Sequence, residues 1–187
     1  MILSRRVTGL SGALVAFLTL TWLSSGCAIS MPFRGPGYTA GGGATLAADD
    51  GTVVVALTQG VLDRGKRGPF DRATSTVSKG MADVPGLIGY SFRRQLLGKR
   101  VWTMTVWQDE TALAAFVRSP LHREAMRADG PATEEFLFHS FRVPADDLPI
   151  KWNDALERLE RDGTPYPDLG APVADRAKSA RSAQVGD

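Results

Sequence analysis

The chain has 187 residues, of which 43% are hydrophobic and 22% are charged, a composition typical of a globular protein with one hydrophobic core. Its 22 basic and 20 acidic residues nearly balance, and no basic run is interleaved with aromatic residues, so nucleic acid is excluded as an expected partner. The single cysteine, Cys27, excludes an intramolecular disulfide and zinc sites of the multi-cysteine type.

Residues 1–27 have the layout of an export signal. The basic pair Arg5-Arg6 precedes an apolar stretch from about Leu10 to Leu23, which is short for a membrane-spanning helix of about 20 residues. Ser24-Ser25-Gly26-Cys27 then resembles a bacterial lipobox, although Leu23 lies one place too far from the cysteine. We expect an exported, membrane-associated protein that is lipidated at Cys27, or one that is secreted or anchored by its N-terminus. A cytoplasmic protein with a mis-assigned start codon is the alternative.

Two segments are predicted to lack regular structure. Residues 28–50 contain several prolines and glycines, among them the triplet Gly41-Gly42-Gly43, and this composition predicts a flexible spacer. Residues 163–187 carry three prolines and no apolar periodicity after Leu169, which predicts a disordered tail.

Between these segments, β-branched runs bounded by glycine alternate with stretches in which apolar residues recur every three or four positions. The first pattern is typical of strands and the second of amphipathic helices. The predicted elements, in chain order, are a strand over Val53–Thr58, a helix over Phe70–Ala82, strands over Leu87–Leu97 and Val101–Gln108, a helix over Glu110–Ala128, a strand over Glu135–Val143 and a short helix over Lys151–Arg161.

Local signals refine these boundaries. Gly98-Lys99-Arg100 has the length and composition of a hairpin turn. Asp109 is a natural N-cap, although Ala112 replaces the glutamate of a complete capping box. Pro120 is expected to kink or divide the following helix after Ser119.

This order of elements predicts an α+β, ferredoxin-like βαββαβ domain over residues 51–145, followed by a C-terminal helix over residues 146–162. Both helices of the domain are expected to cover one face of the sheet. The other face would carry large apolar groups, and a patch of that size is normally an interface or a ligand surface. We therefore expect two sheets to pack together in a homodimer, a dimeric α+β barrel, or a small molecule to cover the face.

Four segments resemble the antibiotic biosynthesis monooxygenase-like superfamily of dimeric α+β barrels, most strongly its branch that looks like spheroidene monooxygenase and related DUF3291-type proteins. The segments are Pro85-Gly86-Leu87-Ile88-Gly89-Tyr90-Ser91, Val101-Trp102-Thr103-Met104-Thr105-Val106-Trp107-Gln108-Asp109-Glu110, Ala112-Leu113-Ala114-Ala115-Phe116-Val117 and His122-Arg123-Glu124-Ala125-Met126. The resemblance implies a monooxygenase-like protein for a hydrophobic aromatic, polyene or haem ligand. Because the superfamily also holds proteins without known activity, a non-catalytic ligand-binding or interaction lipoprotein is the alternative.

His122 is the first candidate for a functional residue. It lies just after Pro120, where an interrupted helix can expose a side chain to the space between helix and sheet. In haem-binding members of the superfamily a histidine on this helix ligates iron, so the resemblance implies an axial haem ligand here. A helix-surface or dimer-edge histidine is the alternative, and the cofactor is accordingly either none or haem.

Aromatic side chains are the candidate ligand surface. Trp102 and Trp107 are predicted to lie on opposite faces of one strand, because five residues separate them and the side-chain period is two. Together with Phe116 and Phe138 they are expected to bind a flat hydrophobic molecule. Core packing is the alternative for each tryptophan.

Cofactor-independent oxygenases of this type need a base and hydrogen-bond donors near a phenol or ketone of the substrate. His139, Tyr90 and Arg94 are the strand-borne candidates for these roles beside His122. Asp109-Glu110 is better explained by helix capping. The chain has no glycine-rich nucleotide loop, no Gly-x-Ser-x-Gly and no His-Glu-x-x-His, which disfavours nucleotide-dependent, serine-hydrolase and zincin chemistry.

Overall fold

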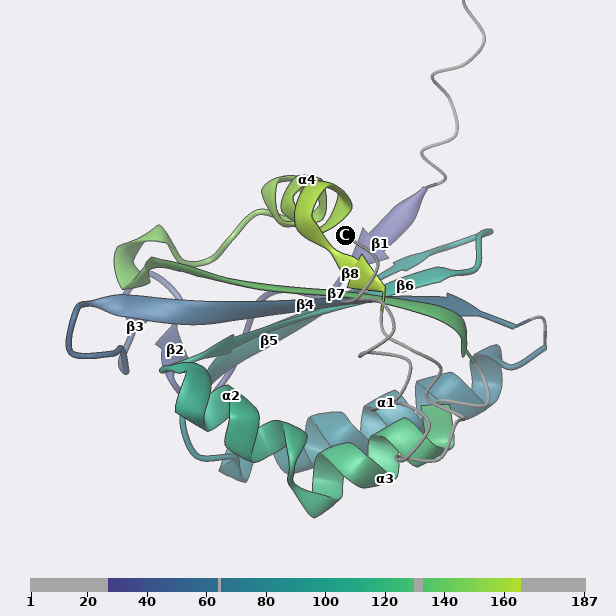
Figure 1. The fold of residues 1–187 in the computed structure, drawn as a ribbon, viewed down its shortest axis with the longest axis horizontal. Helices are drawn as coiled ribbons and strands as arrows, with labels where there is room; N and C mark the ends of the chain where they lie inside the picture. Colours follow the sequence, from purple (N-terminus) through teal and green to yellow (C-terminus); the bar gives the residue numbers. More distant parts are fainter. Residues whose placement is uncertain (1–26, 64, 130–132, 166–187) are drawn as a thin grey trace, which may run out of the picture.

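A computed structural model of the chain describes residues 27–63, 65–129 and 133–165. Its centre is an antiparallel six-stranded sheet of order β1-β5-β6-β4-β7-β8 (Figure 1). The strands of this sheet are β1 (Ala28–Ser30), β4 (Thr52–Leu62), β5 (Leu87–Gln95), β6 (Arg100–Trp107), β7 (Thr133–Pro144) and β8 (Thr164–Pro165). The other elements are the β2 (Tyr38–Thr39) and β3 (Gly43–Ala44) hairpin, the helices α1 (Arg67–Gly80), α2 (Glu110–Val117), α3 (Pro120–Asp129) and α4 (Trp152–Asp162), and the short 3-10 turns η1 (Met81–Asp83) and η3 (Ala145–Asp147).

The predicted ferredoxin-like fold is confirmed. The chain runs β4, α1, β5, β6, α2 with α3, and β7, and these four strands lie in the order β5-β6-β4-β7. Each strand and helix predicted from the hydrophobic pattern is present. The first strand is longer than predicted, since β4 continues through Gly60 to Leu62 while pairing with both β6 and β7.

The predicted local signals at the second helix are confirmed as well. The Asp109 carboxylate accepts a hydrogen bond of 2.8 Å from the backbone N–H of Ala112, which caps the start of α2. The helix then ends at Val117 and a new helix begins at Pro120, where the missing N–H of proline costs nothing. Pro120 therefore divides this segment into two helices and does not merely bend it.

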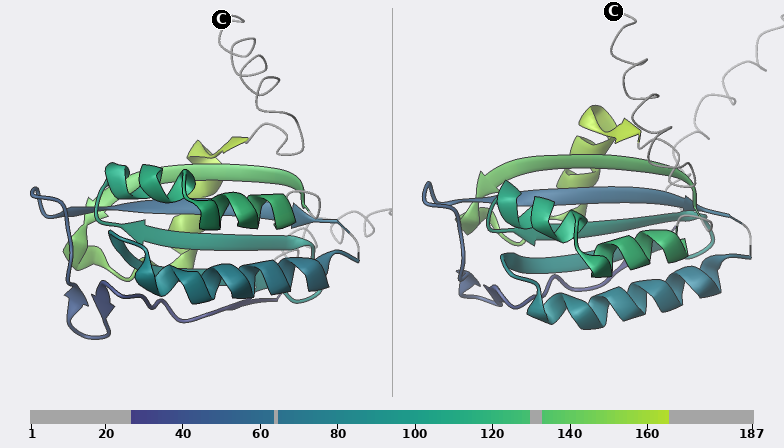
Figure 2. Two further views of the ribbon diagram at one scale, coloured as in Figure 1. Left: turned by 90° about the horizontal axis from the view of Figure 1, so that it is seen from below. Right: turned by 60° about the horizontal axis from the view of Figure 1, so that its bottom comes forward.

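Three helices cover one face of the sheet. Figure 2 shows α1 lying beside the row formed by α2 and α3 across this face. Between the layers, Trp107 is fully buried and its ring contacts that of Phe116, with 4.8 Å between centroids. The buried residues of this cluster are Val54, Ala56, Met81, Leu87, Tyr90, Trp107 and Phe116.

The opposite face is covered by the chain itself, so the predicted open sheet face is wrong. Helix α4 lies across it (Figure 1), and its Ala155 and Leu159 are 0% and 2% exposed. The buried residues of this second cluster are Val53, Val55, Leu57, Ile88, Trp102, Met104, Val106, Val143, Leu148, Ala155 and Leu159. The predicted C-terminal helix is confirmed, and it occupies the surface that the homodimer prediction assigned to a second sheet.

The predicted spacer over residues 28–50 is also wrong. Strand β1 pairs with the end of β5, and Arg34 pairs further along with Tyr90, so this segment forms an edge of the sheet. The glycines serve close packing there: a Cβ on Gly35 would lie 2.3 Å from the Cα of Gly89. A composition that suggested flexibility therefore allows the backbone to approach β5.

Part of the predicted tail is ordered, since β8 pairs with Leu137 and Phe138 of β7. The rest of that tail, residues 166–187, and residues 1–26 of the predicted signal lie outside the described residues. Cys27 is exposed. No helix within the described ranges is both long and apolar enough to cross a membrane.

Candidate functional site

A pocket of about 380 Å³ lies between α1 and the edge of the sheet formed by β1, β5 and β6. Its floor is apolar, with Phe92 and Val101 from the sheet and Phe70 from α1. Ile29 and Met31 form its outer rim and are 45% and 41% exposed. The complete lining is Ile29, Ser30, Met31, Arg34, Phe70, Asp71, Thr74, Ser75, Ser78, Phe92, Arg93, Arg94, Val101, Trp102 and Thr103.

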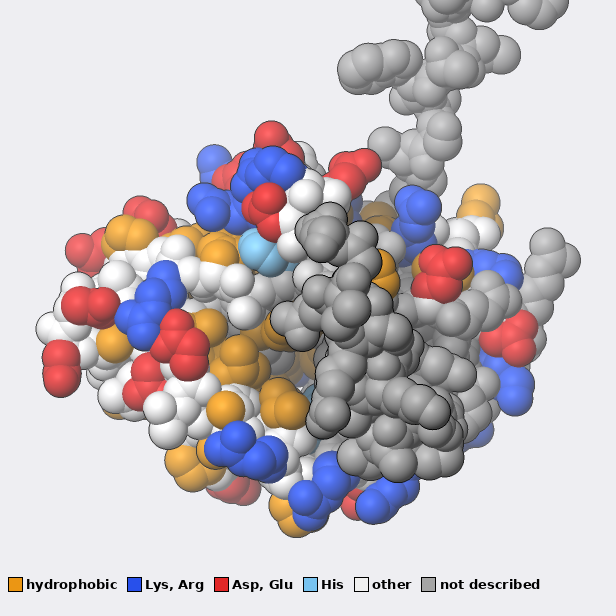
Figure 3. Space-filling view, in the orientation of Figure 1, with side chains coloured by type: hydrophobic (Ala, Val, Ile, Leu, Met, Phe, Trp, Pro, Cys, Tyr) orange, Lys and Arg blue, Asp and Glu red, His pale blue; other side chains and the backbone are white. Residues whose placement is uncertain are grey.

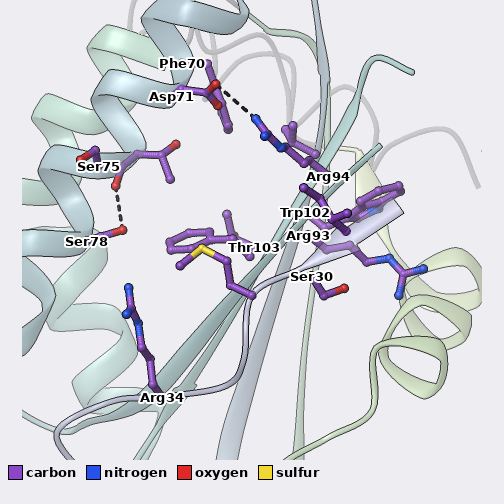
Figure 4. A pocket seen from close by; sticks show the side chains of 15 residues that line it. Ser30, Arg34, Phe70, Asp71, Ser75, Ser78, Arg93, Arg94, Trp102 and Thr103 are labelled. Atoms are coloured by element: carbon purple, nitrogen blue, oxygen red, sulfur yellow. Dashed lines mark hydrogen bonds and ion pairs between the residues drawn. The ribbon is translucent and has the colours of Figure 1, made fainter. Parts of the chain in front are cut away.

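Charged groups stand at the two ends of this pocket (Figure 4). At one end Arg94 pairs with Asp71 of α1, with 3.3 Å between Nη1 and Oδ2. At the other end Arg34 extends from the N-terminal edge segment, and its guanidinium carbon lies 5.6 Å from the centroid of the Tyr90 ring. Tyr90, over which Arg34 lies, and Arg94 are four positions apart on β5. At the rise of a strand this is about 13 Å, so the two arginines mark opposite ends of the pocket.

Hydroxyl groups of α1 line the wall that faces the sheet. Ser78 donates a hydrogen bond of 2.8 Å to the backbone carbonyl of Thr74, four residues earlier in the helix. The Tyr90 hydroxyl donates a long bond of 3.5 Å to the backbone carbonyl of Ser78. Thr103 supplies a further hydroxyl from β6. The pocket thus offers an apolar floor, hydroxyls along one side and an arginine at each end, an arrangement suited to an apolar molecule with a polar group.

The N-terminal edge segment is held firmly in this position. Met31 donates its backbone N–H to the Phe92 carbonyl at 2.8 Å, and Ser91 donates its hydroxyl to the Met31 carbonyl at 2.6 Å. The same Ser91 oxygen accepts a bond of 3.0 Å from the indole N–H of Trp152 on α4. This buried serine therefore connects α4, β5 and the edge of the pocket.

The residues predicted for a site do not form one site. Arg94 lines the described pocket, and Tyr90 borders it through Ser78. Trp107, Phe116 and Phe138 lie on the same face of the sheet, in the cluster beneath the helices. Of the three other predicted residues of the domain, Trp102 and His139 belong to the opposite face, although Trp102 also lines the pocket, and His122 packs against Phe116.

The predicted opposite orientation of the two strand tryptophans is confirmed. Trp102 packs on the α4 side and donates its indole N–H to Gln59 at 2.8 Å, while Trp107 donates to Thr105 at 2.9 Å on the helix side. Trp102 also lines the pocket, together with Arg93. Figure 4 shows Arg93 directed away from α1, and its Nε is buried without a hydrogen-bond partner among the described residues.

His122 of α3 packs against α2. Its ring meets Phe116 edge-on, with 5.1 Å between centroids, and its backbone N–H is 3.2 Å from the Ser119 hydroxyl. Burial lowers the pKa of His122, and a hydrogen bond to the backbone carbonyl of Val117 partly opposes this effect. The imidazole is therefore held in its neutral form at neutral pH.

His139 lies on the α4 side, stacked against Phe141 at 5.4 Å and 3.9 Å from a carboxylate oxygen of Asp162. The sheet separates it from His122, so the two histidines cannot act on one substrate. Neither lines the described pocket. Haem ligation by His122 would need a separate cavity beside α3, and it stays a prediction. Within the described residues, no three metal-binding side chains form a cluster.

The prediction missed Arg34, Met31 and Ile29, which all come from the supposed spacer. One signal could have found them: apolar residues alternate at positions 29, 31 and 33, as expected of an edge strand. The prolines and glycines around them concealed this alternation.

These features can be compared with known proteins. Residues 52–128 match the family described as antibiotic biosynthesis monooxygenase. The matched segment runs from β4 to α3 and leaves out β1, β7 and α4. It supports the family resemblance drawn from the sequence, at the level of the family and not of its spheroidene monooxygenase-like branch.

Similar solved structures come from several microorganisms. A candidate monooxygenase from Lactobacillus acidophilus NCFM has 16% identity and a TM-score of 0.46 over 52% of this chain, which spans about half, 47%, of that protein. A conserved protein from Methanosarcina mazei has 15% identity and a TM-score of 0.46 over 49% of this chain and 92% of its own. A dimeric ferredoxin-like protein of unknown function from Thermobifida fusca has 17% identity and a TM-score of 0.45 over 50% and 92%. No curated protein matches the chain.

Proposed function

We propose that the domain is a monooxygenase-like protein that binds a hydrophobic aromatic or polyene molecule in the pocket under α1. The observation that carries this proposal is the pocket itself, with an apolar floor closed at both ends by arginines. Its position between α1 and the sheet lies largely within the segment that matches the monooxygenase family. A cation beside a phenol or enol favours the ionised form, which is the form that donates electrons to oxygen.

The reaction would insert one oxygen atom of O₂ into the substrate and release the other as water. The substrate itself would supply the two electrons, so that a phenol CH group becomes a quinone carbonyl. Arg34 would stabilise the substrate oxyanion at one end of the pocket, and Asp71, which pairs with Arg94 at the other end, is the carboxylate that lines it.

A second candidate function is ligand binding without catalysis. The observation that favours it is that no histidine lines the described pocket and that Asp71 is half exposed and already paired with an arginine. Such a site binds and orients a molecule but offers a weaker base for proton removal.

A substitution that fills the pocket tests both candidates. Thr74→Phe places a ring in the cavity, whereas Thr76→Phe places the same ring on the exposed side of the same helix. We expect 1-naphthol to quench the tryptophan fluorescence of the wild-type chain saturably, and its affinity to fall about tenfold in Thr74→Phe but not in Thr76→Phe. Wild-type protein that fails to bind naphthols contradicts both candidates.

Oxygen uptake separates the two candidates. An oxygen electrode trace with 1-naphthol, together with mass spectrometry of the product, should show uptake that Thr74→Phe reduces in parallel with binding. Saturable binding with no uptake and with unchanged naphthol would instead support the non-catalytic protein.

Three further parts of the proposal rest on sequence and resemblance. They are membership of the spheroidene monooxygenase-like branch, export and membrane association through residues 1–27 with Cys27 as the lipidation site, and formation of a homodimer. Mass spectrometry of the mature N-terminus tests the second of these parts.

A further inference from the structure

The pocket has a wall that the family match does not include. The matched segment begins at residue 52, yet Ile29, Met31 and Arg34 line the cavity from the edge segment before it. That segment is therefore an addition to the domain at the place where a ligand would enter.

The backbone of Arg34 is fixed against β5. Its N–H donates to the Tyr90 carbonyl at 3.1 Å, and the Tyr90 N–H donates back to the Arg34 carbonyl at 2.7 Å. Gly35 allows this close approach, because any side chain there would collide with Gly89. The backbone from which the Arg34 side chain extends is thus held in place by pairing with the sheet and is not part of a free loop.

The guanidinium of Arg34 is available to a ligand. It lies over the Tyr90 ring and is exposed, and within the described residues no carboxylate pairs with it. Arg94 at the other end of the pocket is instead neutralised by Asp71. Figure 4 shows Arg34 directed toward Ser78 on α1, with the apolar side chains of the floor between it and the Arg94 pair.

We propose that Arg34 makes this pocket selective for a hydrophobic monoanion, whose carboxylate or phenolate contacts the guanidinium while its apolar body lies over Met31, Phe92 and Phe70. An arginine fork binds a carboxylate or phenolate oxygen by charge-assisted hydrogen bonds, and the neighbouring apolar surface binds the remainder. This inference rests on the proposed function and names the chemical class of its ligand.

A pair of probes of equal shape tests the charge requirement. Isothermal titration of the full-length protein with 2-naphthoate and with the uncharged 2-naphthamide should show about a tenfold preference for the anion. In Arg34→Met the preference should vanish through weaker naphthoate binding, and Arg34→Lys should restore part of it because the charge returns without the fork.

Arg161→Met is the matched control, because it removes the same charge from an exposed position of α4. It should keep the wild-type preference for naphthoate. Circular dichroism spectra of all variants should overlay, since Arg34 and Arg161 are both exposed.

The outcomes separate this inference from the proposed function. Equal binding of both probes to the wild type, or an Arg34→Met variant that still prefers naphthoate, overturns the role of Arg34 but leaves the proposed binding of a ligand in the pocket intact. Failure of both probes to bind overturns the pocket as well. Decanoate in the same titration distinguishes a fatty acid from an aromatic acid, and tighter binding of naphthoate supports the aromatic source.

Discussion

At the scale of single residues, the two histidines differ in what surrounds them. His122 is packed against Phe116 and the last turn of α2, while His139, whose side chain is 18% exposed, is stacked on Phe141 near Asp162. Desolvation disfavours a charged imidazole, so the lowered pKa of His122 follows from its burial against α2.

This lowered pKa predicts that acid destabilises the domain through His122. The unfolded chain binds the proton more readily, so stability is fully present above the unfolded pKa of about 6.5 and is lost as the pH falls through the folded pKa. Each pH unit between the two values is worth about 1.4 kcal/mol. Urea unfolding at pH 7.5 and pH 5 should therefore show a steeper loss for the wild type than for His122→Leu.

His139→Gln is the control for this experiment, because it leaves His122 in place. It should keep the wild-type loss of stability between the two pH values. The same loss in His122→Leu as in the wild type would assign the acid sensitivity to other groups.

At the scale of elements, one carboxylate determines where α2 begins. Asp109 has extended backbone dihedrals and accepts the N–H of Ala112, so it satisfies a donor that the helix itself cannot. Asp109→Ala should lower the free energy of unfolding by about 1 kcal/mol, and Asp109→Asn by less, because asparagine is also a good N-cap. Chemical denaturation checks both values, and an alanine variant as stable as the wild type would contradict the capping role.

The elements show what the sequence could and could not predict. Side-chain periodicity and the signals at Asp109 and Pro120 predicted the ferredoxin-like core and the division of the second helix, because these depend on neighbours along the chain. The edge segment was missed because Gly35 acts through a distant contact with Gly89. The opposite faces of Trp102 and Trp107 were predictable, whereas the pocket was not, since Arg34 reaches it only through long-range strand pairing.

At the scale of the whole molecule, both faces of the sheet are covered by the same chain. Helices α1, α2 and α3 pack on one face and α4 on the other, and charged side chains cover the outer surface of α4 (Figure 3). A second copy could reach the α4 face only by displacing that helix. In this chain α4 therefore takes the position that a partner sheet would need.

This arrangement predicts that loosening α4 creates a new interface. Ala155 is fully buried against the sheet, so Ala155→Asp should place an unpaired charge there, detach the helix and expose the apolar cluster beneath it. We expect the mass from light scattering to rise about twofold as two exposed faces pair, with a gain in binding of an apolar dye. Asn153→Asp adds the same carboxylate on the exposed side of α4 and should change neither reading. An Ala155→Asp protein with the mass and dye binding of the wild type would mean that α4 is not what keeps this face from a partner.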